Sequence, residues 1–217
     1  LRSLVGSEMC IRDRMPAVKE LLAGAGWPAD TLTDVFVSIG PGSFTGLRIG
    51  VSIARTLAWS VGARIVAVPT MEVLARNALA AATPPTLVVP MVDAKRSQVY
   101  TAAYRLEGGA CVRLLDACLA EPGAFLAGLP RPPAVLGEGV PRHLVAIEAA
   151  GAIVLPEALW PGRAEEVLAV GLRMARAGEF TAARELVPHY VRRPEMEERW
   201  EQRHAAASGS AAPPGEG

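Results

Sequence analysis

The sequence predicts an α/β fold of two lobes, with a largely parallel sheet and one antiparallel hairpin. Short β-branched and apolar runs alternate with helical periodicity along most of the chain, which is typical of sheets covered by helices. A break at Thr83, Pro84 and Pro85 interrupts this alternation. We therefore expect a partial first lobe at residues 15–85 and a second lobe at residues 86–193.

The ends of the chain do not follow this pattern. Residues 1–14 show no clear helical or strand period, so we expect a non-native or disordered start. A charged helix is expected at residues 195–204, within a charged and flexible end at residues 194–217.

The first lobe opens with a helix from Met15, because Val18, Leu21 and Leu22 have helical spacing and a glycine pair follows them. The remaining elements follow from apolar runs, glycine breaks and helical periodicity. We expect strands at residues 34–39 and 64–68, a tight loop at 40–46, and helices at 47–61 and 71–81.

The second lobe contains the hairpin, because two alternating strands flank a turn at Glu107, Gly108 and Gly109. Three short helices separate the later apolar runs. We expect strands at residues 86–92, 98–106, 110–119, 134–136 and 152–155, helices at 122–129, 142–150 and 163–177, and an extended segment at 188–191.

Composition argues against several classes of protein. The chain has 217 residues and a net charge of zero, whereas proteins that bind nucleic acid unaided usually carry a basic excess. Its cysteines, Cys10, Cys111 and Cys118, are odd in number and match no zinc motif. No signal peptide is recognisable and no apolar run approaches the ~18–20 residues of a membrane span. We expect a cytoplasmic protein without a membrane segment.

The loop after the first strand has two interpretations. A glycine loop between a strand and a helix can bind phosphate through free N–H groups. However, Leu47 and Arg48 stand where a Walker A loop needs lysine and a hydroxyl, and the glycine spacing differs from the dinucleotide fingerprint. A structural turn in which Ser43 or Thr45 caps the helix is therefore favoured. The loop consists of Gly40, Pro41, Gly42, Ser43, Phe44, Thr45 and Gly46.

The helix at residues 47–61 is apolar on nearly every side, so it should be buried on more than one side. One stripe of it consists of small residues that let another backbone approach closely. Packing inside the protein and contact with another subunit both remain open. We assign Val18, Leu22, Gly46, Ile49, Gly50, Ile53, Ala54, Leu57 and Ala58 to a partner interface.

The segment GPGSFTGLRIG at residues 40–50 resembles the signature of the TsaB (YeaZ) family, within the wider group that includes the catalytic paralogue TsaD. Further segments resemble this family as well. They lie at residues 68–70, 91–100, 137–139 and 188–192, so the resemblance covers residues 15–193.

The resemblance implies an actin-like ATPase (ASKHA) fold with two RNase H-like lobes. The first strands of that fold are not recognisable, so the first lobe is expected to be truncated at its N-terminus. The family forms threonylcarbamoyladenosine in tRNA. The implied role is a non-catalytic subunit that binds TsaD and acts with the ATPase TsaE, reaching tRNA only indirectly. Homodimerisation is open, and the alternative function is an ATP-binding ATPase or phosphotransferase of the same fold.

No catalytic, cofactor-binding or metal-binding residue is expected. The catalytic paralogue carries two histidines four residues apart, whereas His143, His189 and His204 are far apart here. Asp93 follows a strand, where α/β sites gather, but Lys95 and Arg96 beside it favour a solvated turn.

Overall fold

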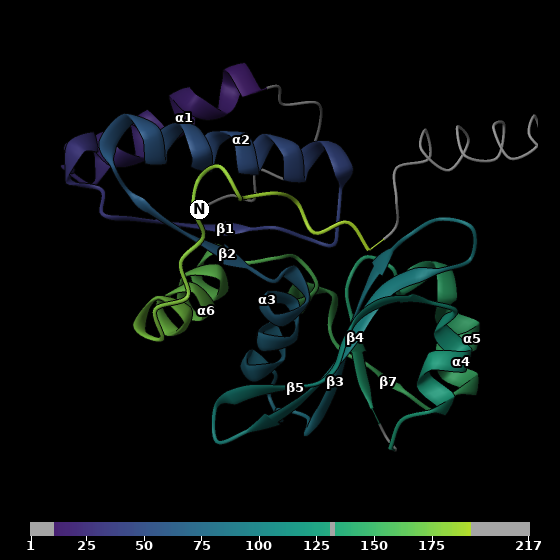
Figure 1. The fold of residues 1–217 in the computed structure, drawn as a ribbon. Helices are drawn as coiled ribbons and strands as arrows, with labels where there is room; N and C mark the ends of the chain where they lie inside the picture. Colours follow the sequence, from purple (N-terminus) through teal and green to yellow (C-terminus); the bar gives the residue numbers. More distant parts are fainter. Residues whose placement is uncertain (1–10, 131–132, 192–217) are drawn as a thin grey trace, which may run out of the picture.

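The computed structural model describes residues 11–130 and 133–191, which form two sheets. The first sheet pairs β1 (Asp34–Ser38) with β2 (Arg64–Val68) in parallel. The second sheet has five strands in the order β5 (Ala110–Ala120), β4 (Val99–Glu107), β3 (Leu87–Asp93), β6 (Ala134–Leu136) and β7 (Ile153–Val154). Helices cover both faces of the first sheet. α2 (Phe44–Val61) lies on one face and α6 (Ala164–Arg176) on the other (Figure 1).

α1 (Ile11–Gly24) lies beside α2, on the same side of the first sheet (Figure 1). It begins at Ile11, so the helix is longer at its N-terminal end than the expected start at Met15. A 3-10 helix at Ala29–Thr31 then leads into β1. Residues 1–10, the expected helix at 195–204 and the expected tail lie outside the described residues.

α6 approaches the first sheet closely because it carries a glycine at the contact. A Cβ atom at Gly171 would overlap the ring of Phe36 in β1. Val170 lies next to Gly171 and is buried in the same core as Val66 and Val68 of β2. The small residue at position 171 therefore sets the distance between α6 and β1.

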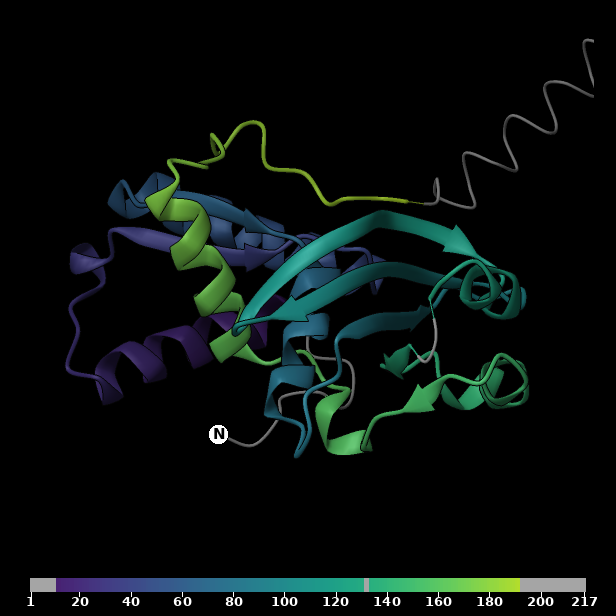
Figure 2. The same cartoon turned by 90° about the horizontal axis from the view of Figure 1, so that it is seen from below.

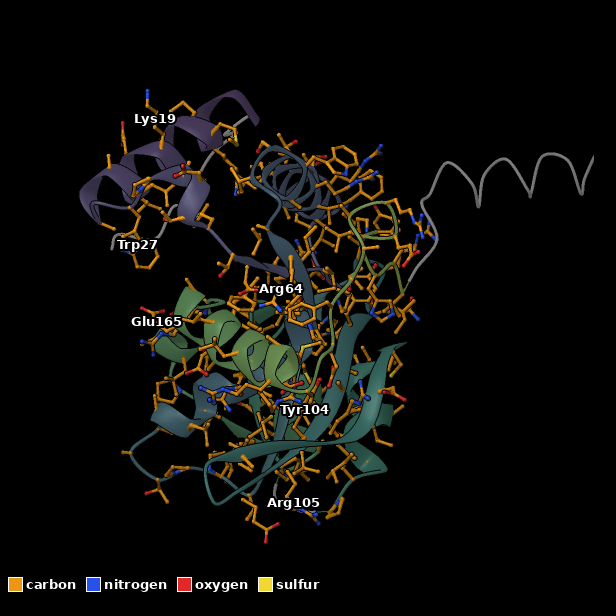
Figure 3. The ribbon with its side chains drawn as sticks, turned by 60° about the vertical axis from the view of Figure 1, so that its left-hand side comes forward. Lys19, Trp27, Arg64, Tyr104, Arg105 and Glu165 are labelled. Carbon is orange, nitrogen blue, oxygen red and sulfur yellow. The ribbon has the colours of Figure 1, made fainter. Side chains whose placement is uncertain are left out.

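α3 (Thr70–Asn77) joins the two lobes. Met71 and Leu74 on this helix pack into a core with Val88 and Tyr104 of the second sheet, and Tyr104 is buried there (Figure 3). The helix continues as a 3-10 turn at Ala78–Ala80, so the α-helical part is shorter than expected. The lobes share one core because α3 contributes to it from the first lobe.

The second sheet contains the expected hairpin. β4 (Val99–Glu107) and β5 (Ala110–Ala120) are antiparallel and form a long, curved pair (Figure 2). Its other strands and helices occur near their expected positions, with shorter helices. They are β3 (Leu87–Asp93), β6 (Ala134–Leu136), β7 (Ile153–Val154), α4 (Pro122–Ala127) and α5 (Leu144–Ala149), with 3-10 helices at Pro141–His143 and Glu157–Leu159.

Residues 181–191, which we call the closing segment, return to the first lobe after α6. The N–H of Thr181 donates to the carbonyl of Ile65 at 2.8 Å, and Leu186 is buried in the core beneath α2. The N–H of His189 donates to the carbonyl of Ile39 at 2.7 Å. The closing segment is therefore attached to the first sheet at both ends, although it forms no regular strand there.

Candidate partner-binding face and glycine loop

The glycine loop is held by the residues around it. The N–H of Gly40 donates to Oγ1 of Thr70 at 2.8 Å, and the N–H of Thr70 donates to the carbonyl of Gly40 at 3.0 Å. Gly40 has a φ of +117°, and a Cβ atom there would stand 2.8 Å from the carbonyl oxygen of His189. Position 40 therefore requires glycine for two reasons. Other residues rarely adopt this φ, and their Cβ atom would collide with the closing segment.

Ser43 caps α2. Its Oγ accepts a hydrogen bond from the N–H of Gly46 at 3.3 Å, while the N–H of Leu47 donates to its carbonyl at 2.9 Å. Of the two expected caps, Ser43 is therefore the one that binds the helix N-terminus. With the bonds of Gly40, this geometry supports the structural-turn interpretation of residues 40–46.

The small residues of α2 face the protein's own sheet. Ala54 is 1% exposed and Ala58 is 8% exposed, and both pack in one core with Ile65 and Leu186. A Cβ atom at Gly50 would lie 3.7 Å from a methyl group of Val37 in β1. This packing argues against direct contact of Ala54, Ala58 and Gly50 with a partner, because the close approach that they allow is made by β1 and β2. Their assignment to a partner interface stays a prediction.

The other assigned residues have mixed surroundings. Ile49 is buried, which also argues against direct contact with a partner. Gly46 lies in the first turn of α2, where an added Cβ atom would touch Ser43. The remaining four are half-buried and stay predicted interface residues; they are Ile53 and Leu57 on α2 and Val18 and Leu22 on α1.

The exposed side of α2 carries aromatic and basic side chains. Phe44 is 44% exposed and Trp59 is 66% exposed. The guanidinium carbon of Arg48 lies 5.1 Å from the centre of the Phe44 ring, and that of Arg55 lies 5.1 Å from the Trp59 ring. Tyr190 of the closing segment stacks on Phe44, with 5.3 Å between the ring centres. We call these five residues the α2 face.

The sequence analysis missed this face, although a signal for it existed. Phe44, Arg48, Arg55 and Trp59 are separated by four, seven and four residues, which places them on one side of a helix. The contribution of Tyr190 could not be found in this way, because it comes from a distant part of the chain.

Two polar groups of the second lobe have surroundings that the structure describes in detail. Asp93 accepts a hydrogen bond from the N–H of Lys95 at 3.2 Å and pairs with Arg142 at 3.1 Å, which agrees with a solvated turn. Burial raises the pKa of the Cys111 thiol to about 12, so this cysteine is a poor nucleophile. Within residues 11–130 and 133–191, no group of three His, Cys, Asp or Glu side chains could hold a metal ion.

None of the helices in the described part of the chain is long and apolar enough to span a membrane.

Comparison with known proteins identifies the family. A family model described as TsaD, tRNA N6-adenosine threonylcarbamoyltransferase, matches residues 10–207. The tRNA threonylcarbamoyladenosine biosynthesis protein TsaB of Bacillus subtilis (strain 168) is 35% identical over 192 residues, which covers 86% of this chain and 81% of the relative. TsaB of Escherichia coli (strain K12) is 32% identical over 102 residues, which covers 45% of this chain and 44% of the relative.

Two solved structures share the fold. YeaZ from Pseudomonas aeruginosa aligns with a TM-score of 0.71 at 22% identity, covering 84% of this chain and 86% of that one. A protein from Pseudomonas aeruginosa described as similar to peptidase YEAZ aligns with a TM-score of 0.72 at 24% identity, covering 83% of each chain. These alignments confirm the predicted actin-like α/β fold. Together with the sequence matches, they place the chain in the TsaB (YeaZ) family, within the wider group that includes TsaD.

Proposed function

We propose that this protein is a non-catalytic subunit of the complex that forms threonylcarbamoyladenosine in tRNA. In this role it binds and supports a TsaD-like catalytic subunit. It acts with a TsaE-like ATPase and reaches tRNA only through its partners. Family membership supports the pathway, and the α2 face is the observation that carries the partner role.

The α2 face has the composition of a binding surface. Interfaces are enriched in aromatic residues and arginine, and their strongest contributions come from buried Trp, Tyr and Arg side chains. Phe44 and Trp59 expose large apolar areas to solvent, and Leu21 is exposed on the neighbouring helix α1. Covering these side chains would release water from apolar surface. A stable interface of this kind should bury about 1,200–2,000 Å² in total.

The proposed interface differs from the one expected on sequence grounds. Its contacts would come from the α2 face and from the half-buried residues Val18, Leu22, Ile53 and Leu57. Ala54 and Ala58 would act indirectly, because they hold α2 against its sheet.

The geometry of the glycine loop supports a role without nucleotide chemistry. The N–H groups of Gly40 and Gly46 already donate to Thr70 and Ser43, so they are not available to a phosphate. The closing segment also lies directly against Gly40.

Reconstitution tests the proposal. The TsaD-like and TsaE-like proteins of the same organism would be combined with tRNA, ATP and a threonylcarbamoyl donor, with and without this protein. We expect modified tRNA to form efficiently only when this protein is present, and we expect it to co-elute with the TsaD-like subunit. Equal modification in its absence, or phosphate release from ATP by the protein alone, would contradict the proposal.

A further inference from the structure

We infer that Asn77 holds the two lobes at a fixed angle, because its side chain ties together the two places where the chain passes between them. The outbound crossing leads from the end of α3 to β3 at residues 77–86, and the return crossing leads from β7 to α6 at residues 155–163. Asn77 belongs to the outbound crossing and forms hydrogen bonds with the return crossing. The inference is independent of the proposed function, because it concerns how the lobes move and not what they bind.

The two crossings are the places where a rotation of the lobes would have to occur. Domain motions are absorbed by a few residues in the connecting segments. The outbound crossing contains the 3-10 helix at Ala78–Ala80, the return crossing contains the one at Glu157–Leu159, and the rest of both is irregular. Such short elements have few hydrogen bonds of their own to resist bending. The contacts between the two crossings therefore decide whether the lobes can rotate.

The Asn77 amide connects the crossings with two hydrogen bonds. Its side chain is 0% exposed, and Nδ2 donates to the carbonyl of Leu159 at 2.9 Å and to that of Pro161 at 2.8 Å. An asparagine amide nitrogen carries two N–H donors, so both are used here. Oδ1 has no hydrogen-bond partner among the described residues. The reversed orientation would place Oδ1 against both carbonyls, so the two acceptors fix the orientation of the amide.

Opening the hinge at this point would break both hydrogen bonds inside the protein. A buried donor or acceptor that loses its partner loses the full cost of its desolvation. Here the amide of Asn77 and the carbonyls of Leu159 and Pro161 would lose their partners together. Separating the crossings is therefore unfavourable unless the junction opens far enough to admit water.

The return crossing is itself held in shape. Nε1 of Trp160 donates to the carbonyl of Leu155 at 2.9 Å, and Trp160 packs against the apolar cores on both faces of the second sheet. Leu155 and Leu159 are buried in the core that α3 shares. Asn77 is therefore bonded to a segment that is fixed to the second lobe.

Ion pairs between α3 and α6 add a second connection. Figure 1 shows α3 between the lobes, with α6 close to it. Nε of Arg76 lies 2.7 Å from Oε2 of Glu166, and the side chains of this pair are only 22% and 19% exposed. Arg173 pairs with Glu72 at 2.8 Å. Because the return crossing leads directly into α6, these pairs restrain the same two segments as Asn77 does.

The experiment measures the distance distribution between one spin label in each lobe by double electron–electron resonance. The labels are attached at Ser52→Cys on α2 and Glu148→Cys on α5, which are exposed positions. The native cysteines are replaced in every protein by Cys10→Ala, Cys111→Ala and Cys118→Ala. Circular dichroism melting confirms that each protein is folded.

Three variants are compared with this parent protein. Asn77→Leu keeps the approximate size of the side chain and removes both donors. The matched control is Thr101→Val, which also removes a buried hydrogen bond, from Oγ1 to the carbonyl of Pro90 at 3.0 Å, but within the second sheet. Glu166→Gln weakens the ion pair with Arg76 at a partly exposed position and is the milder change.

We expect one narrow distance peak for the parent, a broader distribution for Asn77→Leu, a smaller broadening for Glu166→Gln and an unchanged width for Thr101→Val. Hydrogen exchange of residues 155–163 should become about tenfold faster in Asn77→Leu, because two buried hydrogen bonds no longer oppose local opening. Thr101→Val should leave exchange in this segment unchanged.

A broad or two-peaked distribution in the parent would overturn the inference, because the lobes would already rotate. A folded Asn77→Leu protein with the width of the parent would also overturn it, since Asn77 would then contribute only to local stability. If Asn77→Leu does not fold, Glu166→Gln decides: broadening supports the inference and an unchanged width overturns it. None of these results depends on binding to the TsaD-like subunit, so the proposed function is tested separately.

Discussion

The ring of Phe44, in the first turn of α2, stacks on the ring of Tyr190 in the closing segment, with their centres 5.3 Å apart and their planes inclined by 30°. This contact joins the glycine loop to a segment near the end of the described chain. It also widens the exposed aromatic surface of α2. The same two residues thus stabilise the loop and contribute to the proposed binding face.

A double-mutant cycle measures how much the stack of Phe44 and Tyr190 contributes to stability. We expect Phe44→Ala and Tyr190→Ala to be less than additive in urea unfolding, with a coupling of about 0.5–1.5 kcal/mol, which is typical of aromatic pairs. Tyr190→Phe is the control, because it keeps the ring. Strict additivity would mean that the stack contributes nothing to stability.

A larger side chain among the small residues of α2 that face the sheet should destabilise the fold. Ala54→Leu places extra volume between α2 and its sheet, so we expect the free energy of unfolding to fall by about 1–3 kcal/mol. Ser52→Leu adds a similar side chain at an exposed position of the same helix and should change stability little. If Ala54→Leu were stable but failed to bind the TsaD-like subunit, the stripe would be a partner contact after all.

Two glycine-to-alanine substitutions should have opposite effects. Alanine normally stabilises a helix over glycine by up to about 1 kcal/mol. Gly50→Ala should show this gain, because its Cβ atom would meet Val37 at an ordinary 3.7 Å. Gly171→Ala should instead destabilise the protein, because its Cβ atom would overlap the Phe36 ring. Thermal melting compares the two, and Phe36→Leu should partly rescue Gly171→Ala by giving the new methyl group room.

The free energy of unfolding should decrease at low pH, because the carboxylate of Asp34 becomes protonated there. Hydrogen bonds from Arg64 lower the pKa of this carboxyl below its usual range. A carboxyl whose pKa is lower in the folded state contributes stability above its unfolded pKa and loses it as the pH falls toward the folded pKa. We therefore expect wild type to lose more stability than Asp34→Asn as the pH decreases below about 4. Urea unfolding at several pH values measures this, and parallel curves would contradict it.

The isolated protein should not hydrolyse ATP. The loop that would hold a phosphate donates the N–H groups of Gly40 and Gly46 to Thr70 and Ser43. We expect phosphate release from wild type to equal that of Gly46→Val in a sensitive coupled assay. Release clearly above this variant would favour the alternative function.

Local patterns in the sequence were sufficient for most elements and for the family. β-branched runs, glycine breaks and helical spacing report nearest neighbours along the chain, so β2, β6 and the hairpin of β4 and β5 could be located in advance. The segment at residues 40–50 identified the family because an ordered motif of that length seldom arises by chance.

The orientation of α2 was decided only by the tertiary structure. A stripe of small residues shows that some backbone comes close, but it does not show whether that backbone belongs to the same chain. Here β1 and β2 fill that position, because burying Ala54 and Ala58 against Ile65 and Leu186 completes the core of the first lobe. The opposite side of the helix is therefore left for Phe44, Arg48, Arg55 and Trp59, and Tyr190 reaches it only because the closing segment folds back across the first sheet.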